Sequence, residues 1–186
     1  MKDDIFLMIA RILYDKGYQE FVDAAYIVKK KYPNIRFELL GELDESSPMG
    51  VSKTILDKDV ASGKIEYLGV TNDVPSFLRR ENVVVVLVSS YLEGLNRGLM
   101  EACAMGKPII TSDIPGCKEV VDDSINGFIV PAKNSELLAN AMIKYIELPL
   151  EDKERMKRAS YEKAVRQFDV KHIIKQYDNI IEEIFK

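Results

Sequence analysis

Short apolar runs alternate with amphipathic segments along most of this chain. The apolar runs show little alternation of polar and apolar residues, which is typical of parallel strands buried on both faces. Between these runs, apolar residues recur every three or four positions, the period of a helix with one buried face. We predict strands at residues 5–10, 36–40, 66–68, 83–88, 108–112 and 127–130.

The helical pattern is clearest after the first predicted strand, where we expect a helix at residues 17–32. Its apolar residues Phe21, Ala25 and Val28 share one face, and Pro33 ends the segment. The same reasoning predicts further helices at residues 52–61, 74–80, 97–105, 116–121, 135–147, 151–168 and 170–185.

Regular alternation of strands and helices indicates an α/β fold, with a Rossmann-like, doubly wound parallel sheet of about six strands and helices on both faces. The last two helices have no strand between them, so we expect them to be additions to the sheet unit. Residues 1–186 contain no internal repeat or long linker and are enough for one hydrophobic core, which predicts a single domain.

Composition narrows the classes of function. The net charge of −4 argues against a surface for nucleic acid or anionic membranes, and the longest apolar runs are too short for a transmembrane helix. Cys103 and Cys117 match no zinc-binding spacing, so we expect buried free thiols and a cytoplasmic protein. With His172 as the only histidine, neither a metal site nor a histidine-dependent triad is expected.

The most informative stretch follows the predicted strand at 83–88 and reads SYLEGLNRGLMEACAMGKP, residues 90–108. Ligands of doubly wound sheets bind beyond the carboxyl ends of the strands, and the N-terminus of a helix that starts there suits phosphate. The carboxylates of Glu93 and Glu101 would suit vicinal hydroxyl groups. Spacing by itself favours a simpler interpretation, in which Glu101 faces solvent and Glu93 caps the helix.

Two cations, Arg11 and Lys16, follow the first predicted strand. They could clamp a phosphate, Arg11 through its planar fork and Lys16 as a point charge. Alone, they are more simply explained as solvated surface charges. The argument for a phosphate site strengthens because this loop and the loop after residue 88 both follow strands of the same predicted sheet.

Several segments of this sequence, in their order along the chain, resemble the C-terminal domain of retaining glycosyltransferases of family 4, which have the GT-B fold. The resemblance runs from residue 5 to about residue 147. It rests on the segments ARILYDKGYQEFVDAA, FELLGELD, IEYLGVTNDV, SSYLEGLNRGLMEACAMGKPIITSDIPGCKEVV and NGFIVPAKNSELLANAM. The fourth segment contains the E-x7-E motif of that family.

The resemblance implies roles for individual residues. Arg11 and Lys16 would bind the diphosphate of the donor, and together with Glu93 they would form the catalytic set. Glu101 would hold the ribose, and Val70 would lie near the base. The full set of implied donor-binding residues is Arg11, Lys16, Val70, Glu93, Gly94, Leu95, Asn96, Arg97 and Glu101.

The implied function is retaining transfer from a nucleotide diphosphate sugar, a UDP-sugar, without a metal or other cofactor. The implied acceptor is a saccharide or a lipid-linked saccharide in bacterial capsule, lipopolysaccharide or glycan assembly. Asn96 and Ser89 stand where the family often has proline, which leaves the identity of the donor open.

The resemblance also implies an N-terminal acceptor domain that these residues do not include. We therefore expect the isolated domain to be inactive, and the full enzyme to work in the cytoplasm or at the cytoplasmic face of the membrane. The apolar face of the last helix would favour dimers in crystals. Two alternatives remain, namely a GT-B sugar-nucleotide epimerase and a non-catalytic, flavodoxin-like interaction module.

Overall fold

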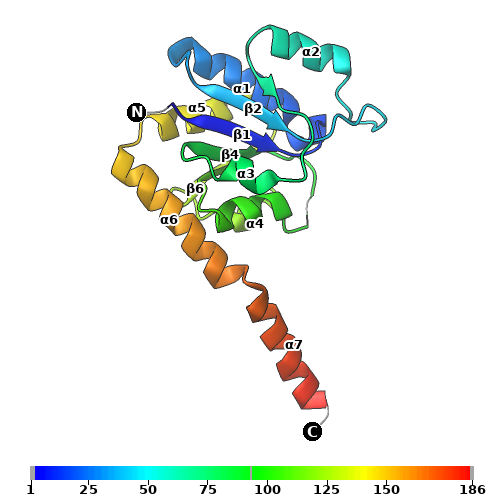
Figure 1. The fold of residues 1–186 in the computed structure, drawn as a ribbon, viewed down its shortest axis with the longest axis vertical. Helices are drawn as coiled ribbons and strands as arrows, with labels where there is room; N and C mark the ends of the chain where they lie inside the picture. Colours follow the sequence, from blue (N-terminus) through cyan, green and yellow to red (C-terminus); the bar gives the residue numbers. More distant parts are fainter. Residues whose placement is uncertain (1–2, 93, 185–186) are drawn as a thin grey trace.

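In the computed structural model, which describes residues 3–92 and 94–184, a six-stranded sheet forms the centre of the protein (Figure 1). Every neighbouring pair of strands is parallel, and the strand order is β3-β2-β1-β4-β5-β6. The strands are β1 (Ile5–Ile9), β2 (Arg36–Leu40), β3 (Glu66–Tyr67), β4 (Val83–Leu87), β5 (Ile109–Ser112) and β6 (Gly127–Val130). The predicted fold class is confirmed.

The central strands are buried because helices cover both faces of the sheet. All five residues of β4 are buried, which is why its sequence, VVVVL, shows no alternation. Parallel pairing sets Phe6 of β1 beside Phe37 of β2, and their rings stack with centroids 5.3 Å apart. The apolar runs of the sequence thus form one continuous core.

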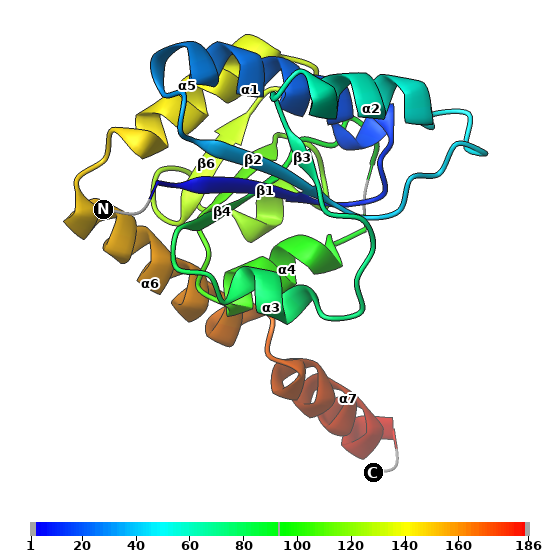
Figure 2. The ribbon, with the colours of Figure 1, turned by 45° about the horizontal axis from the view of Figure 1, so that its top comes forward.

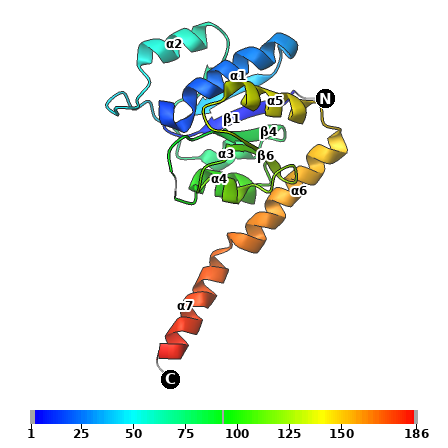
Figure 3. The same ribbon diagram turned by 180° about the vertical axis from the view of Figure 1, so that it is seen from behind.

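The helices form two layers (Figure 2). On one face lie α1, α2 and α5, and Figure 3 shows α1 and α5 side by side. On the other face lie α3 and α4, with α6 packed against α4. The α-helices are α1 (Tyr18–Lys31), α2 (Lys53–Ala61), α3 (Val74–Leu78), α4 (Arg97–Ala104), α5 (Ser135–Ile146), α6 (Leu150–Gln167) and α7 (Val170–Ile184).

Two predicted helices differ in their detail. The segment predicted as a helix at 116–121 forms only a short 3-10 helix, η2 (Lys118–Val120). The helix predicted to begin at Gly17 begins at Tyr18, because Gly17 has a left-handed backbone with φ of 90° and ends another 3-10 helix, η1 (Tyr14–Lys16). The other boundaries agree with the sequence to within one or two residues.

Helix α7 extends away from the sheet (Figures 1 and 3). Its side chains Val170, Ile174, Tyr177, Ile180 and Ile181 are each more than half exposed. Ile173 and Ile184 belong to the same apolar pattern in the sequence as Ile174, and their side chains lie outside the described residues. In the described part of the chain, no helix is long and apolar enough to span a membrane.

Cys103 and Cys117 are both buried free thiols, as predicted. The Cys103 thiol donates a hydrogen bond to the carbonyl oxygen of Ser160, with 2.9 Å between sulfur and oxygen. Burial raises the pKa of Cys103 to about 11, so this thiol is protonated at neutral pH.

Candidate functional site

A hollow of about 340 Å³ opens at the carboxyl ends of β1 and β4. It lies where the strand order departs from chain order, since β4 pairs with β1 on the side away from β2. Open α/β sheets bind their ligands at such a switch point. Six of the residues predicted for donor binding line this hollow, namely Arg11, Lys16, Gly94, Leu95, Asn96 and Arg97.

The loop that carries Arg11 and Lys16 is seated on the end of β4. The carbonyl oxygen of Asp15 accepts hydrogen bonds from Ser90 N–H, at 2.8 Å, and from the Ser89 hydroxyl, at 3.2 Å. A Cβ atom on Gly17 would lie 2.5 Å from Val88 Cγ2 and 2.7 Å from Val88 O, so only glycine allows this approach. The tight packing sets the position of Lys16 at the edge of the hollow.

On the opposite side of the hollow, Asn96 caps the N-terminus of α4. Its Oδ1 accepts a hydrogen bond from Leu99 N–H at 3.0 Å, and its own N–H donates to Gly116 O at 2.8 Å. A proline at this position has no N–H and could not make the second bond. In the described part of the chain, the N–H groups of Arg97 and Gly98 have no acceptor. These N–H groups and the helix dipole favour a bound anion.

Arg11 reaches across to a loop that follows β2. Its Nη1 donates to Asp44 Oδ2 at 3.1 Å, and the Arg11 side chain is 55% exposed while that of Asp44 is 20% exposed. The pKa of Asp44 lies below its ordinary value, first because the Ser46 hydroxyl donates to its carboxylate, and then because Arg11 and Ser47 N–H also donate to it. The negative charge of Asp44 therefore persists at neutral pH.

Two of the other predicted residues, Glu101 and Val70, lie apart from the hollow. Glu101 lines a neighbouring apolar groove between α4 and α6, and its Oε1 accepts from Arg97 Nε at 2.8 Å. Arg97 lines both spaces and connects them. Val70, which is 67% exposed, is not among the residues that line the hollow. Glu93 lies outside the described residues.

Two features of the site escaped the sequence reasoning. The first is Asp44 as partner of Arg11, for which the only sequence signal was an acidic residue followed by two serines in a turn. The second is the pairing of Arg97 with Glu101, which their spacing of four residues on a helix could have suggested. In residues 3–92 and 94–184, no group of three or more His, Cys, Asp or Glu side chains could hold a metal ion.

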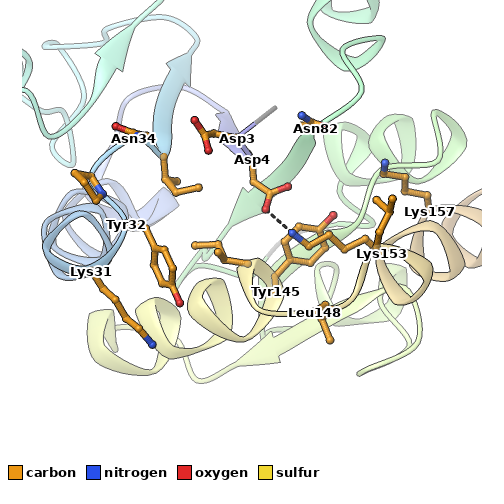
Figure 4. A pocket seen from close by; sticks show the side chains of 14 residues that line it. Asp3, Asp4, Lys31, Tyr32, Asn34, Asn82, Tyr145, Leu148, Lys153 and Lys157 are labelled. Atoms are coloured by element: carbon orange, nitrogen blue, oxygen red, sulfur yellow. Dashed lines mark hydrogen bonds and ion pairs between the residues drawn. The ribbon is translucent and has the colours of Figure 1, made fainter. Parts of the chain in front are cut away.

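A second hollow, of about 250 Å³, lies at the opposite end of the sheet, beside the amino ends of β1, β2 and β4 (Figure 4). Lys153 Nζ donates to Asp4 Oδ2 at 2.6 Å, and both side chains are almost buried, at 10% and 12% exposed. The Lys153 ammonium group also lies 4.9 Å from the centroid of the Tyr145 ring. Burial and the nearby charge of Asp4 raise the pKa of Tyr145.

Comparison with known proteins decides the family. Residues 1–163 match the family described as glycosyl transferases group 1. The chain belongs to this family. The match covers the hollow at the carboxyl ends of β1 and β4, and it gives no support to the alternative of a flavodoxin-like interaction module.

Individual relatives agree with this assignment. The chain is 33% identical, over all of its length and 46% of the relative, to the N,N'-diacetylbacillosaminyl-diphospho-undecaprenol alpha-1,3-N-acetylgalactosaminyltransferase of Campylobacter jejuni. The crystal structure of Anabaena HepE in complex with UDP matches 97% of this chain and 49% of its own, with a TM-score of 0.85 and 22% identity. The pneumococcal O-GlcNAc transferase GtfA, in complex with UDP and GlcNAc, matches 97% of this chain and 36% of its own, with a TM-score of 0.76 and 24% identity.

These two structures share the fold of this chain at low sequence identity. The chain spans about half the length of the Campylobacter relative and of the Anabaena structure. It corresponds to the C-terminal domain of the GT-B fold, as the sequence motifs predicted.

Proposed function

We propose that this chain is the donor-binding half of a retaining glycosyltransferase that uses a nucleotide diphosphate sugar, a UDP-sugar. The observation that carries the proposal is the hollow at the carboxyl ends of β1 and β4. It brings together Arg11, Lys16 and the N-terminus of α4, three features that each favour phosphate. The UDP bound in the related Anabaena structure supports the same class of ligand.

In this proposal the diphosphate lies between the two cations and the N–H groups of Arg97 and Gly98. When the bond between the sugar and the diphosphate breaks, negative charge grows on the leaving phosphate. Fixed cations and N–H groups stabilise that charge without reorganising, and this lowers the barrier. The chain's own cations thereby take the part that a metal ion plays in other transferases.

The sugar and the nucleoside would then extend to either side of the diphosphate. Glu101 Oε1 accepts a hydrogen bond from Arg97, and Glu101 would hold the ribose hydroxyls through its second oxygen, Oε2. Glu93 and the backbone of residues 94–97 would contact the sugar. Val70 would lie near the base, at the end of the strand next to β2.

The acceptor is proposed to be a lipid-linked saccharide, in line with the diphospho-undecaprenol in the name of the Campylobacter relative. The acceptor would bind to an N-terminal domain that closes over the donor and excludes water. We therefore expect residues 1–186 alone to bind the donor but to transfer little or no sugar. Sugar transfer by the purified 186-residue chain would contradict this part of the proposal.

Calorimetric titration of UDP tests the diphosphate site. Arg11→Ala combined with Lys16→Ala should weaken UDP binding about 100-fold, because two charge-assisted contacts are lost. The matched control is Arg158→Ala combined with Lys175→Ala, which changes the charge equally at two exposed positions on α6 and α7. The control should bind UDP as tightly as wild type.

Two results would overturn the proposal. One is wild-type protein that does not bind UDP at all. The other is a double variant at Arg11 and Lys16 whose UDP affinity stays within about twofold of wild type, since the phosphate clamp would then lie elsewhere.

A further inference from the structure

A turn at residues 42–51 is hydrogen-bonded to the loop that carries Arg11. Ile12 N–H donates to Glu42 O at 2.8 Å, Tyr14 N–H donates to Met49 O at 2.8 Å, and Leu13 and Gly50 form an isolated antiparallel bridge. Two loops that are about thirty residues apart in the chain are thus joined at the edge of the hollow. The backbone near Arg11 is fixed by this turn as well as by β1.

Within the turn, the carboxylate of Asp44 is held in one orientation. Its Oδ1 accepts from the Ser46 hydroxyl at 2.7 Å and from Ser47 N–H at 3.2 Å. The backbone is equally constrained, because a Cβ atom on Gly50 would collide with the carbonyl oxygen of Asp44. The turn therefore fixes the carboxylate independently of Arg11.

The second oxygen, Oδ2, accepts from Arg11 Nη1 at 3.1 Å. In the described part of the chain this is the only partner of the guanidinium group, so Nε and Nη2 remain for another acceptor. An arginine that is 55% exposed would otherwise sample many rotamers. Tethering one nitrogen reduces the entropy that is lost when the other nitrogens bind a ligand.

We infer that Asp44 is a positioning residue, which holds the guanidinium of Arg11 toward the phosphates of the donor without contacting the donor itself. The inference rests on the proposed function, because it assumes that Arg11 binds the diphosphate. It adds the turn at residues 42–51 to the donor site, as the element that orients one of its two cations.

A double-mutant cycle with UDP as the probe tests this role. Asp44→Asn should weaken UDP binding to the 186-residue chain about fivefold, the upper end of what partly exposed ion pairs contribute. In an Arg11→Ala background, the same change should have no further effect, because Asp44 acts through Arg11. The matched control is Asp57→Asn, which removes the same charge from an exposed ion pair on α2 and should leave UDP affinity unchanged.

Ser46→Ala provides a second test that keeps the charge of Asp44. It removes one of the two bonds that hold Oδ1, so UDP binding should weaken about twofold in wild type and not at all with Arg11→Ala. Thermal unfolding of each variant shows whether the fold is intact. If Asp44→Asn does not fold, the Ser46→Ala pair decides the question.

The outcomes separate the inference from the proposed function. Wild-type protein that fails to bind UDP overturns both. UDP binding that weakens with Arg11→Ala, but is unchanged or tighter with Asp44→Asn, overturns only the role of Asp44. An equal loss of affinity in both backgrounds also overturns it, because Asp44 would then act on the fold of the loop rather than through Arg11.

Discussion

The hollow at the carboxyl ends of the sheet and the hollow beside Tyr145 at its amino ends are of similar size, but their cations have different surroundings. At the carboxyl ends, Arg11, Lys16 and the first N–H groups of α4 surround a space of about 340 Å³. At the amino ends, three lysines line a space of about 250 Å³, and each of them is bonded to a carboxylate. The pairs are Lys31–Glu147, Lys153–Asp4 and Lys157–Glu154.

The difference teaches that volume alone does not identify a ligand site. The lysines at the amino ends pair with carboxylates at 2.6 Å, and the Lys153–Asp4 pair is almost buried, so breaking it would destabilise the fold. At the carboxyl ends, the only carboxylate bonded to Arg11 in the described part of the chain is held by its own turn. We therefore assign stability to the Lys153–Asp4 pair beside Tyr145 and binding to the hollow at the carboxyl ends.

The largest expected effect is on stability, at the amino ends. Lys153→Met should lower the free energy of unfolding by about 2 to 3 kcal/mol, because it leaves the nearly buried Asp4 without its partner. Its UDP affinity should match wild type. Urea unfolding and UDP titration of the same preparation measure both quantities.

The control for that variant is the pair Lys153→Met and Asp4→Leu, which removes both charges and should recover most of the lost stability.

At the other end, Arg11→Ala should leave stability within about 0.5 kcal/mol of wild type while it weakens UDP binding, since its ion pair is exposed. A loss of UDP affinity in Lys153→Met would show that the amino ends of the sheet also contribute to UDP binding.

A smaller effect on UDP affinity should distinguish two helices that are capped by asparagine in the same way. Asn96 caps α4 at the hollow, and Asn134 caps α5 with a hydrogen bond of 2.9 Å from Leu137 N–H. Each substitution by alanine should cost about 1 kcal/mol of stability. Only Asn96→Ala should also weaken UDP binding, because the cap orients the N-terminus of α4 toward the phosphates.

Chemical denaturation and UDP titration of both alanine variants check this expectation. Equal UDP affinity for Asn96→Ala and Asn134→Ala would mean that the N-terminus of α4 does not take part in binding.

The smallest effects are shifts in two carboxyl pKa values. The pKa of Asp44 is lowered first by the Ser46 hydroxyl, and the pKa of Glu147 is lowered first by Lys31 and then by Tyr32. Ser46→Ala and Arg11→Ala should therefore each raise the pKa of Asp44. Likewise, Lys31→Met should raise the pKa of Glu147 more than Tyr32→Phe does.

Titration of the carboxyl carbons by NMR measures both shifts. Since both pKa values are lowered in the folded state, the stabilisation from each carboxylate is complete above the ordinary pKa of about 4 and is lost as the pH falls through the lowered value. An unchanged pKa of Asp44 in Ser46→Ala would show that the Ser46 hydroxyl does not hold this carboxylate.

The accuracy of the predictions differed between local and long-range features. Strands such as β4 were predictable because their apolar residues follow one another in the chain. Glu38 was not predictable as a buried residue, because its partner Arg80 lies 42 positions away and donates to both of its oxygens, at 3.0 and 2.6 Å. The pair of Arg11 and Asp44, 33 positions apart, escaped the sequence for the same reason.

The sequence by itself determined the helices and strands, the fold class and the family. Hydrophobic periodicity and ordered motifs are properties of residues that follow one another in the chain. Only the tertiary structure decided which charges meet. It set Asp44 beside Arg11, gave each lysine at the amino ends a carboxylate and left the N-terminus of α4 facing the hollow. Such partners belong to segments that are far apart in the chain and meet only when it folds. Local sequence patterns therefore do not predict them.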